Sequence, residues 1–185
     1  MGKKLTVYAG LNECVLSFVP SSASRILDVG CGTGVTGERL RQERERIVAG
    51  ITYSQEEAAL AAGRLSQVIC AELNTYDFSA VGKFDCVILS HILEHLYSPE
   101  DLLERLKHVL EPESVVVVAL PNVVWWRQRL EFLFGQWRYQ DWGILDRTHF
   151  RFFDQRSSRE LLEQAGYEIL RAKPDGLIPF IGPMR

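Results

Sequence analysis

The chain has 185 residues, a length that suits one domain with a substantial buried core. With 46% hydrophobic and 24% charged residues it has the composition of an ordinary globular protein, and its net charge of −3 supplies no basic field to attract nucleic acid. The four cysteines follow no CxxC or Cys/His spacing, so we expect reduced thiols in a cytoplasmic protein and no metal site. No apolar run at the amino terminus is long enough to predict a signal peptide or a membrane span.

Short apolar segments alternate with longer amphipathic ones along the first two thirds of the chain. The apolar segments predict strands buried on both faces, at residues 25–29, 46–51, 67–70, 84–90 and 114–120. Helical patterns follow the first, second and fourth strands, at residues 35–45, 54–65 and 98–111. A repeated strand–helix–strand order requires parallel strands joined by crossovers. We therefore expect an α/β fold, with a doubly wound, mostly parallel, Rossmann-like sheet and helices on both faces.

The alternation stops between residues 121 and 153. This segment contains all four tryptophans, together with five arginines and His149. After it the pattern predicts a helix at 157–166 and a strand at 167–172. A sheet of this kind would place one more strand in the remaining tail. Two interpretations therefore stay open: the sheet lacks its last strand, or the sequence is cut short.

The stretch RILDVGCGTG, residues 25–34, places three alternating glycines directly after the first strand. Glycine within an element costs stability, so three of them indicate that a ligand approaches the backbone closely. In an open parallel sheet, ligands bind beyond the carboxyl ends of the strands where the strand order reverses. Gly32, Gly34 and Gly37 match the dinucleotide pattern GxGxxG, but that fingerprint also needs an acid where this chain has Thr52. The interpretation as an NAD-binding site therefore lacks the acidic residue that would bind the ribose.

Asp28, Gly30, Gly32 and Gly34 form a second pattern, DxGxGxG. It resembles the first motif of class I S-adenosylmethionine-dependent methyltransferases. The resemblance continues through FDCVILSHILEHL, SPEDLLERLKHVLEPES and VVVVALPN, and it covers roughly residues 20–172 in order. The segment DRTHFRFFDQRSSRELLEQAGYEI is similar to the late segment of a subgroup associated with glycan and polysaccharide biosynthesis.

The resemblance implies one methyltransferase domain over residues 1–185, with a seven-stranded type of sheet. Within it we expect a cofactor-binding half at 20–120, a substrate lid at 121–153, and a C-terminal helix and strand at 154–185.

The resemblance also implies S-adenosylmethionine as the cofactor, with its amino-acid part above the glycine backbone. Asp28 would orient the turn or the cofactor's ammonium, Thr52 and Tyr53 would meet the ribose and adenine, Glu72 would lie near the adenine amine, and Ser90 would border the methionine moiety. The complete set of implied cofactor-binding residues is Asp28, Gly30, Cys31, Gly32, Gly34, Thr52, Tyr53, Glu72, Leu73 and Ser90.

Position 52 departs from the family pattern, which usually has Asp or Glu there. A carboxylate accepts charge-assisted hydrogen bonds from the ribose hydroxyls, about twice as strong as neutral ones. Thr52 offers one neutral hydroxyl, so we expect weaker cofactor binding or help from another group.

The aromatic and arginine-rich lid is expected to contact the methyl acceptor. Aromatic faces stack on planar groups or sugars, and arginines bind phosphate or carboxylate. The expected substrate-binding residues are Trp125, Trp126, Arg127 and Arg147. For a hydroxyl acceptor the leading candidate for the general base is His149, with His91 second, because imidazole titrates near neutral pH. A purely structural role is an equal alternative for His149.

The function that the sequence predicts is methyl transfer to a small-molecule acceptor, such as a sugar or a nucleotide-linked sugar. Two alternatives stay open at this point. One is a cofactor-binding module without catalysis that partners a biosynthetic enzyme, and the other is an NAD-dependent oxidoreductase.

Overall fold

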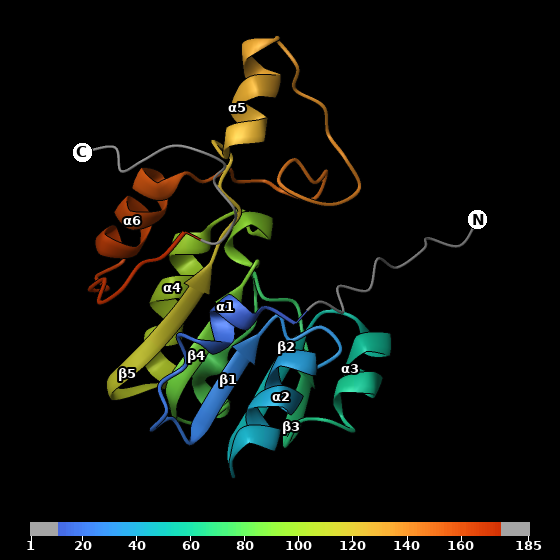
Figure 1. The fold of residues 1–185 in the computed structure, drawn as a ribbon. Coiled ribbons are helices and arrows are strands. Elements are labelled where there is room, and N and C mark those ends of the chain that lie inside the picture. The colour runs from blue at the N-terminus through green and yellow to red at the C-terminus, as the bar shows by residue number, and fades with distance from the viewer. Residues whose placement is uncertain (1–10, 175–185) are drawn as a thin grey trace.

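The computed structural model describes residues 11–174 as a parallel sheet covered by helices on both faces (Figure 1). Five strands lie in the order β3-β2-β1-β4-β5, and each neighbouring pair is parallel. Their bounds are β1 Arg25–Val29, β2 Ile47–Thr52, β3 Gln67–Cys70, β4 Phe84–Ser90 and β5 Leu110–Ala119. The expected doubly wound α/β fold is confirmed, with five strands in the described part of the chain.

Helices cover the sheet because each buried strand sends alternate side chains to opposite faces. The helices are α1 Glu13–Leu16, α2 Val35–Glu43, α3 Gln55–Ala61, α4 Pro99–Leu106, α5 Trp126–Leu133 and α6 Gln155–Gln164. Three short 3₁₀ turns complete the fold: η1 Phe78–Ala80, η2 Leu93–His95 and η3 Lys107–Val109. Ile26 and Val48 pack with Leu40 of α2 on one face, whereas Leu27 packs with Leu102 of α4 on the other.

The strand order reverses beside β1, which pairs with β2 on one side and with β4 on the other. In register, Asp28 lies opposite Gly50 of β2 and Ile88 of β4. A doubly wound sheet opens a crevice at the carboxyl ends of its strands where the order reverses. The ends of β1, β2 and β4 therefore mark the place for a ligand.

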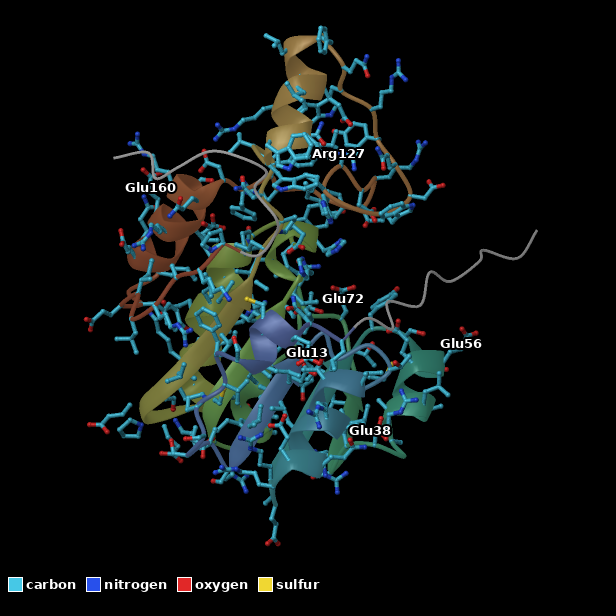
Figure 2. All side chains as sticks on the ribbon, in the orientation of Figure 1. Glu13, Glu38, Glu56, Glu72, Arg127 and Glu160 are labelled. Atoms are coloured by element: carbon cyan, nitrogen blue, oxygen red, sulfur yellow. The ribbon has the colours of Figure 1, made fainter. Side chains whose placement is uncertain are left out.

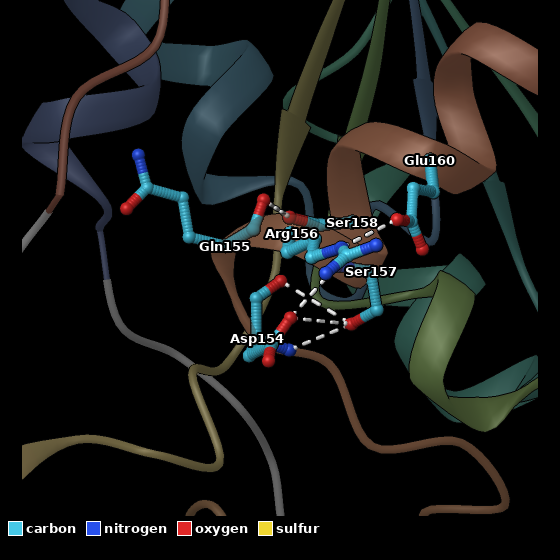
Figure 3. A network of polar contacts seen from close by, with 6 residues as sticks. All are labelled: Asp154, Gln155, Arg156, Ser157, Ser158 and Glu160. Carbon is cyan, nitrogen blue, oxygen red and sulfur yellow. Dashed lines mark hydrogen bonds and ion pairs between the residues drawn. The ribbon is translucent and has the colours of Figure 1, made fainter.

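The lid, residues 121–153, leaves the sheet after β5 and returns to it, with α5 extending away from the strands (Figure 1). Its two ends meet at a parallel bridge between Asn122 and Phe153, where the Val123 N–H donates to the Phe153 carbonyl at 2.8 Å. Directly afterwards Asp154 caps α6 (Figure 3), accepting hydrogen bonds from the Ser157 N–H at 2.7 Å and the Ser157 hydroxyl at 2.9 Å. These bonds lower the pKa of Asp154 and fix the start of α6, directly after the lid.

The strand expected at 167–172 is wrong, because the segment pairs with no strand in the described part of the chain. Instead it turns back from α6 toward α4, and the Tyr167 hydroxyl donates to the Leu103 carbonyl at 2.7 Å. A strand needs a neighbour that shares its hydrogen-bond ladder, and a side-chain anchor does not provide one. The tail from 175 to 185 lies outside the described residues, and among residues 11–174 no helix is both long and apolar enough to cross a bilayer.

Candidate functional site

The turn after β1, residues 30–34 and here called the glycine turn, has a backbone that only glycine adopts readily. Gly30, Gly32 and Gly34 have φ angles of 78°, 53° and 82°. The N–H groups of Gly30 and Cys31 both donate to the Ile51 carbonyl, at 2.8 and 2.9 Å. The turn is thus hydrogen-bonded to the end of β2, and Gly34 leads directly into α2.

Two close approaches hold the glycine turn in place. A Cβ built on Gly30 would lie 1.9 Å from the Cδ1 of Ile92, which follows β4. A Cβ on Gly50 of β2 would lie 2.6 Å from the Sγ of Cys31. The turn is therefore packed between the ends of β2 and β4, and the sheet edge at this point is backbone and glycine.

Asp28 lies beneath the glycine turn with 3% of its surface exposed. Within the described part of the chain its Oδ2 atom has no hydrogen-bond partner, and burial raises the pKa of this carboxyl from 3.8 to about 7. A buried acid normally has a partner, because leaving it unpaired costs free energy. The carboxyl is therefore available to a donor or cation that enters the crevice.

Thr52 ends β2, and its hydroxyl donates to the Oε2 atom of Glu57 at 2.6 Å. Ser54 caps α3 by accepting from the Glu57 N–H at 3.3 Å, which places Glu57 in the first turn of that helix. Sequence reasoning missed Glu57. The signal that could have found it is the spacing Ser54-x-x-Glu57, a capping-box pattern that places a carboxylate at the start of a helix.

The remaining predicted cofactor residues lie at the same edge of the sheet but differ in their contacts. Tyr53 is 74% exposed, whereas Leu73 is half-buried against the core. Glu72 is exposed, and its Oε1 accepts from the Asn74 N–H at 3.1 Å and from the Asn74 amide nitrogen at 2.8 Å. Its carboxylate thus already caps its own turn. Ser90 is half-buried at the end of β4, opposite Ala119.

The two predicted base candidates come from distant segments, and both lie close to Glu94. His91 has a left-handed backbone, with φ 56°, and its Nδ1 lies 3.3 Å from the Oε1 of Glu94. His149 belongs to the lid, and its ring stacks edge-on with that of His95 at a centroid distance of 4.7 Å. The lid also binds this turn through its backbone, because the Phe150 N–H donates to the Glu94 carbonyl at 2.8 Å.

The predicted substrate residues do not form one cluster. The ring centres of Trp125 and Trp126 lie 5.5 Å apart at the start of α5. The guanidinium carbon of Arg127, a residue labelled in Figure 2, lies 5.9 Å from the Trp125 ring centre. Arg147 instead forms an ion pair with Asp141 at 3.0 Å, farther along the lid. A cavity of about 510 Å³ between the base of the lid and α6 contains none of these residues; it is lined by Asn122, Val124, Arg129, Asp154, Gln155, Arg156, Arg159, Glu160 and Glu163.

Comparison with known proteins identifies the family. A model of the methyltransferase domain matches residues 9–172, which is most of the chain. The chain belongs to this methyltransferase family. That membership removes the NAD-dependent oxidoreductase alternative.

The curated relatives of this methyltransferase domain are distant and longer. The ubiquinone biosynthesis O-methyltransferase of Pseudomonas aeruginosa is 30% identical over 111 residues, covering 55% of this chain and 46% of the relative. The O-methyltransferase cnsE of Penicillium expansum is 27% identical over 126 residues, covering 64% of this chain and 44% of the relative. The domain thus spans less than half the length of these two relatives.

Solved structures show the same fold at low identity. A methyltransferase from Archaeoglobus fulgidus aligns with a TM-score of 0.62 and 21% identity, over 80% of this chain and 62% of that one. One from Thermotoga maritima aligns with a TM-score of 0.65 and 18% identity, over 85% of this chain and 69% of that one. Both are described as S-adenosylmethionine-dependent enzymes.

The close packing of Gly30 predicts the effect of adding one methyl group there. We expect Gly30→Ala to lower the free energy of unfolding by about 2 kcal/mol or more, because the new Cβ meets Ile92 and φ is positive. Chemical denaturation measures the change. Gly63→Ala is the matched control: nothing lies closer than 3.8 Å to its Cβ, so it should leave the stability unchanged or slightly higher. Equal effects of the two substitutions would contradict this account.

Burial of Asp28 predicts a pH dependence of stability. Because its pKa is about 7 in the folded chain and 3.8 ordinarily, the folded chain binds more protons between these values. Stability therefore falls as the pH rises through this range, by roughly 4 kcal/mol. Asp28→Asn should be more stable than the wild type at pH 8, and the difference should shrink toward pH 4. Chemical denaturation at several pH values measures this difference. If the difference in the free energy of unfolding did not change with pH, the raised pKa of Asp28 would be disproved.

Proposed function

We propose that this domain binds S-adenosylmethionine over the glycine turn and transfers its methyl group to a hydroxyl of a small-molecule acceptor held under the lid. The observation that carries the proposal is the unpartnered Asp28 carboxyl beneath a turn of bare backbone, where the strand order reverses. Family membership supports the same reaction.

The residues at the crevice fit the chemical groups of this cofactor. Asp28 would accept from the ammonium of the amino-acid part, and this pairing would offset the cost of burying the carboxylate. The positive-φ glycines leave room for a ligand to lie against the peptide units. When bound, the cofactor supplies a methyl group that is already activated by a sulfonium, so the protein's main task is to orient the acceptor.

We propose further that Glu57 supplies the ribose carboxylate that position 52 lacks. Thr52 is buried, and its hydroxyl is used to bind Glu57, so the carboxylate of Glu57 lies at the end of β2. From there it would accept hydrogen bonds from the two ribose hydroxyls as an acid at position 52 does in other family members.

This assignment predicts different effects for two neighbouring glutamates. We expect Glu57→Gln to weaken binding of S-adenosylhomocysteine about tenfold, because a charge-assisted pair becomes neutral. Glu56→Gln is the matched control, since Glu56 is exposed on the same helix and projects outward from it (Figure 2). Calorimetric titration of both variants measures the two affinities. If Glu57→Gln bound S-adenosylhomocysteine with unchanged affinity, Glu57 would not be the carboxylate that binds the ribose.

For the proton of the acceptor hydroxyl we propose His91 as the general base, ahead of His149. Glu94 is fully buried and lies beside the Nδ1 of His91, so it can orient that imidazole and stabilise its protonated form. The Nδ1 of His149, by contrast, is 3.0 Å from the Ile144 carbonyl, a contact within the lid itself. During methyl transfer to the acceptor oxygen, the Nε2 of His91 would accept the hydroxyl proton.

The proposed acceptor class is a sugar or a nucleotide-linked sugar. The support is chemical: tryptophan faces at the start of α5 can stack on a sugar ring, and Arg127 beside them is exposed and can pair with phosphate. The two curated relatives compared above are named O-methyltransferases, which supports a hydroxyl as the accepting group.

Transfer of a labelled methyl group tests the whole proposal. With full-length protein, we expect label to move from S-adenosylmethionine to hydroxyl-bearing sugars or nucleotide sugars. His91→Asn should lower kcat about 100-fold while the affinity for S-adenosylhomocysteine stays unchanged. His108→Asn, at an exposed position in η3, is the control and should keep full activity. Cofactor binding without transfer to any acceptor would instead favour a non-catalytic module.

A further inference from the structure

We propose that Glu94, His95 and His149 form a binding site for one divalent first-row transition-metal cation, at the junction of η2 and the lid. Each residue offers one donor atom, and the three donor atoms lie within 4.8 Å of one another. The spacing of the cysteines predicts no metal site. Here the donors come from two segments more than 50 residues apart.

Glu94 is the strongest indication of a missing cation. Its side chain is completely buried, and neither carboxylate oxygen has a hydrogen-bond partner among residues 11–174. Oε1 has the Nδ1 of His91 at 3.3 Å, whereas no ion pair is found for Oε2 in the described residues. Buried carboxylates are normally hydrogen-bonded, paired or coordinated to a metal. A bound cation would supply the partner that Oε2 lacks among the described residues.

Both histidines are held in the form that a metal requires. The Nδ1 of His95 lies 3.2 Å from the Thr148 carbonyl, and the Nδ1 of His149 lies 3.0 Å from the Ile144 carbonyl. A carbonyl oxygen only accepts hydrogen bonds, so the proton in each ring is on Nδ1. In the neutral imidazole the lone pair is then on Nε2, and this backbone contact is the usual outer support of a metal-binding histidine.

The orientation of His95 has a second layer of support from the lid. The hydroxyl of Thr148 lies 3.1 Å from the Nδ1 of His95 and donates to the Oδ1 of Asp146 at 2.7 Å. The Thr148 N–H donates to the same Asp146 oxygen at 2.8 Å. Asp146 is buried, so the pair of bonds fixes Thr148 and, through it, the ring of His95. Carboxylate-supported histidines are a common feature of metal sites.

The donor set indicates the kind of ion. Donor atoms around a tetrahedral cation at about 2.1 Å lie about 3.4 Å apart, so small rotations of the side chains close this site. Two imidazoles with one carboxylate suit zinc, cobalt or manganese, whereas magnesium and calcium prefer oxygen ligands alone. Three protein ligands leave at least one position open for a further ligand.

The position of the site suggests what the ion does. Ile92, which packs against Gly30, is two residues from Glu94, so the cation would lie next to the glycine turn. An acceptor oxygen bound at the open position would be oriented and its hydroxyl proton made more acidic. This role rests on the proposed methyl transfer, but binding of the cation does not.

Metal binding by the untagged full-length protein tests the proposal. After treatment with EDTA and its removal, the protein is titrated with Co²⁺, followed by visible absorption and calorimetry. We expect one equivalent to bind, with d–d bands of nitrogen and oxygen ligands and no thiolate charge-transfer band. Glu94→Gln and His149→Ala should each weaken Co²⁺ binding at least tenfold, whereas His108→Ala, an exposed histidine elsewhere, should not change it.

Two results would overturn the site: no stoichiometric Co²⁺ binding by the wild type, or unchanged binding by His149→Ala. If Glu94→Gln does not fold, His149→Ala decides, because it removes a half-buried ligand from the lid. Titration of the wild type with S-adenosylhomocysteine separates the two proposals. Normal cofactor binding without Co²⁺ binding in the wild type overturns the metal site alone, whereas Co²⁺ binding without cofactor binding overturns the proposed function alone.

Discussion

The contact between the glycine turn and the residue after β4 is the constraint on which the site depends. With no side chain at Gly30, Ile92 packs directly against the backbone, and with none at Gly50 the Cys31 sulfur packs against β2. These two contacts fix the turn across the point where the strand order reverses. They also bring η2, which carries Glu94 and His95, next to the cofactor crevice. One steric condition therefore positions both the cofactor site and the proposed metal site.

Three acidic side chains around this crevice are held in two different states. Asp28 and Glu94 are buried with unpartnered oxygens, whereas Glu57 is bound by the Thr52 hydroxyl at the rim. An unpaired buried carboxyl lowers stability, and its persistence in a well-packed core is typical of a functional site. Each acid has a proposed partner that the chain does not contain: an ammonium, a ribose and a metal ion. The cost of burial would be offset when those partners bind.

The two ends of the lid pair with each other, and its C-terminal part is also hydrogen-bonded to η2. Its ends pair at Asn122 and Phe153, and Asp154 fixes the helix that follows. Near its C-terminal end the backbone N–H groups of Phe150 and Arg151 donate to the Glu94 carbonyl, at 2.8 and 3.2 Å. Its aromatic start on α5 has no such anchor to η2 among the described hydrogen bonds. The lid therefore combines a fixed segment that carries His149 with a projecting helix suited to contact an acceptor.

The sequence by itself determined the succession of strands and helices along the first 120 residues, the glycine turn and the identity of Asp28, because these depend on local patterns of apolar residues and glycine. The capping spacing from Ser54 also contained the signal for Glu57, although not its bond to Thr52. Tertiary structure alone decided which acids are left without partners and that His149 meets His95. It also decided that residues 167–172 form no strand. Burial and pairing between distant segments depend on how the chain packs, and no local pattern of residues specifies that.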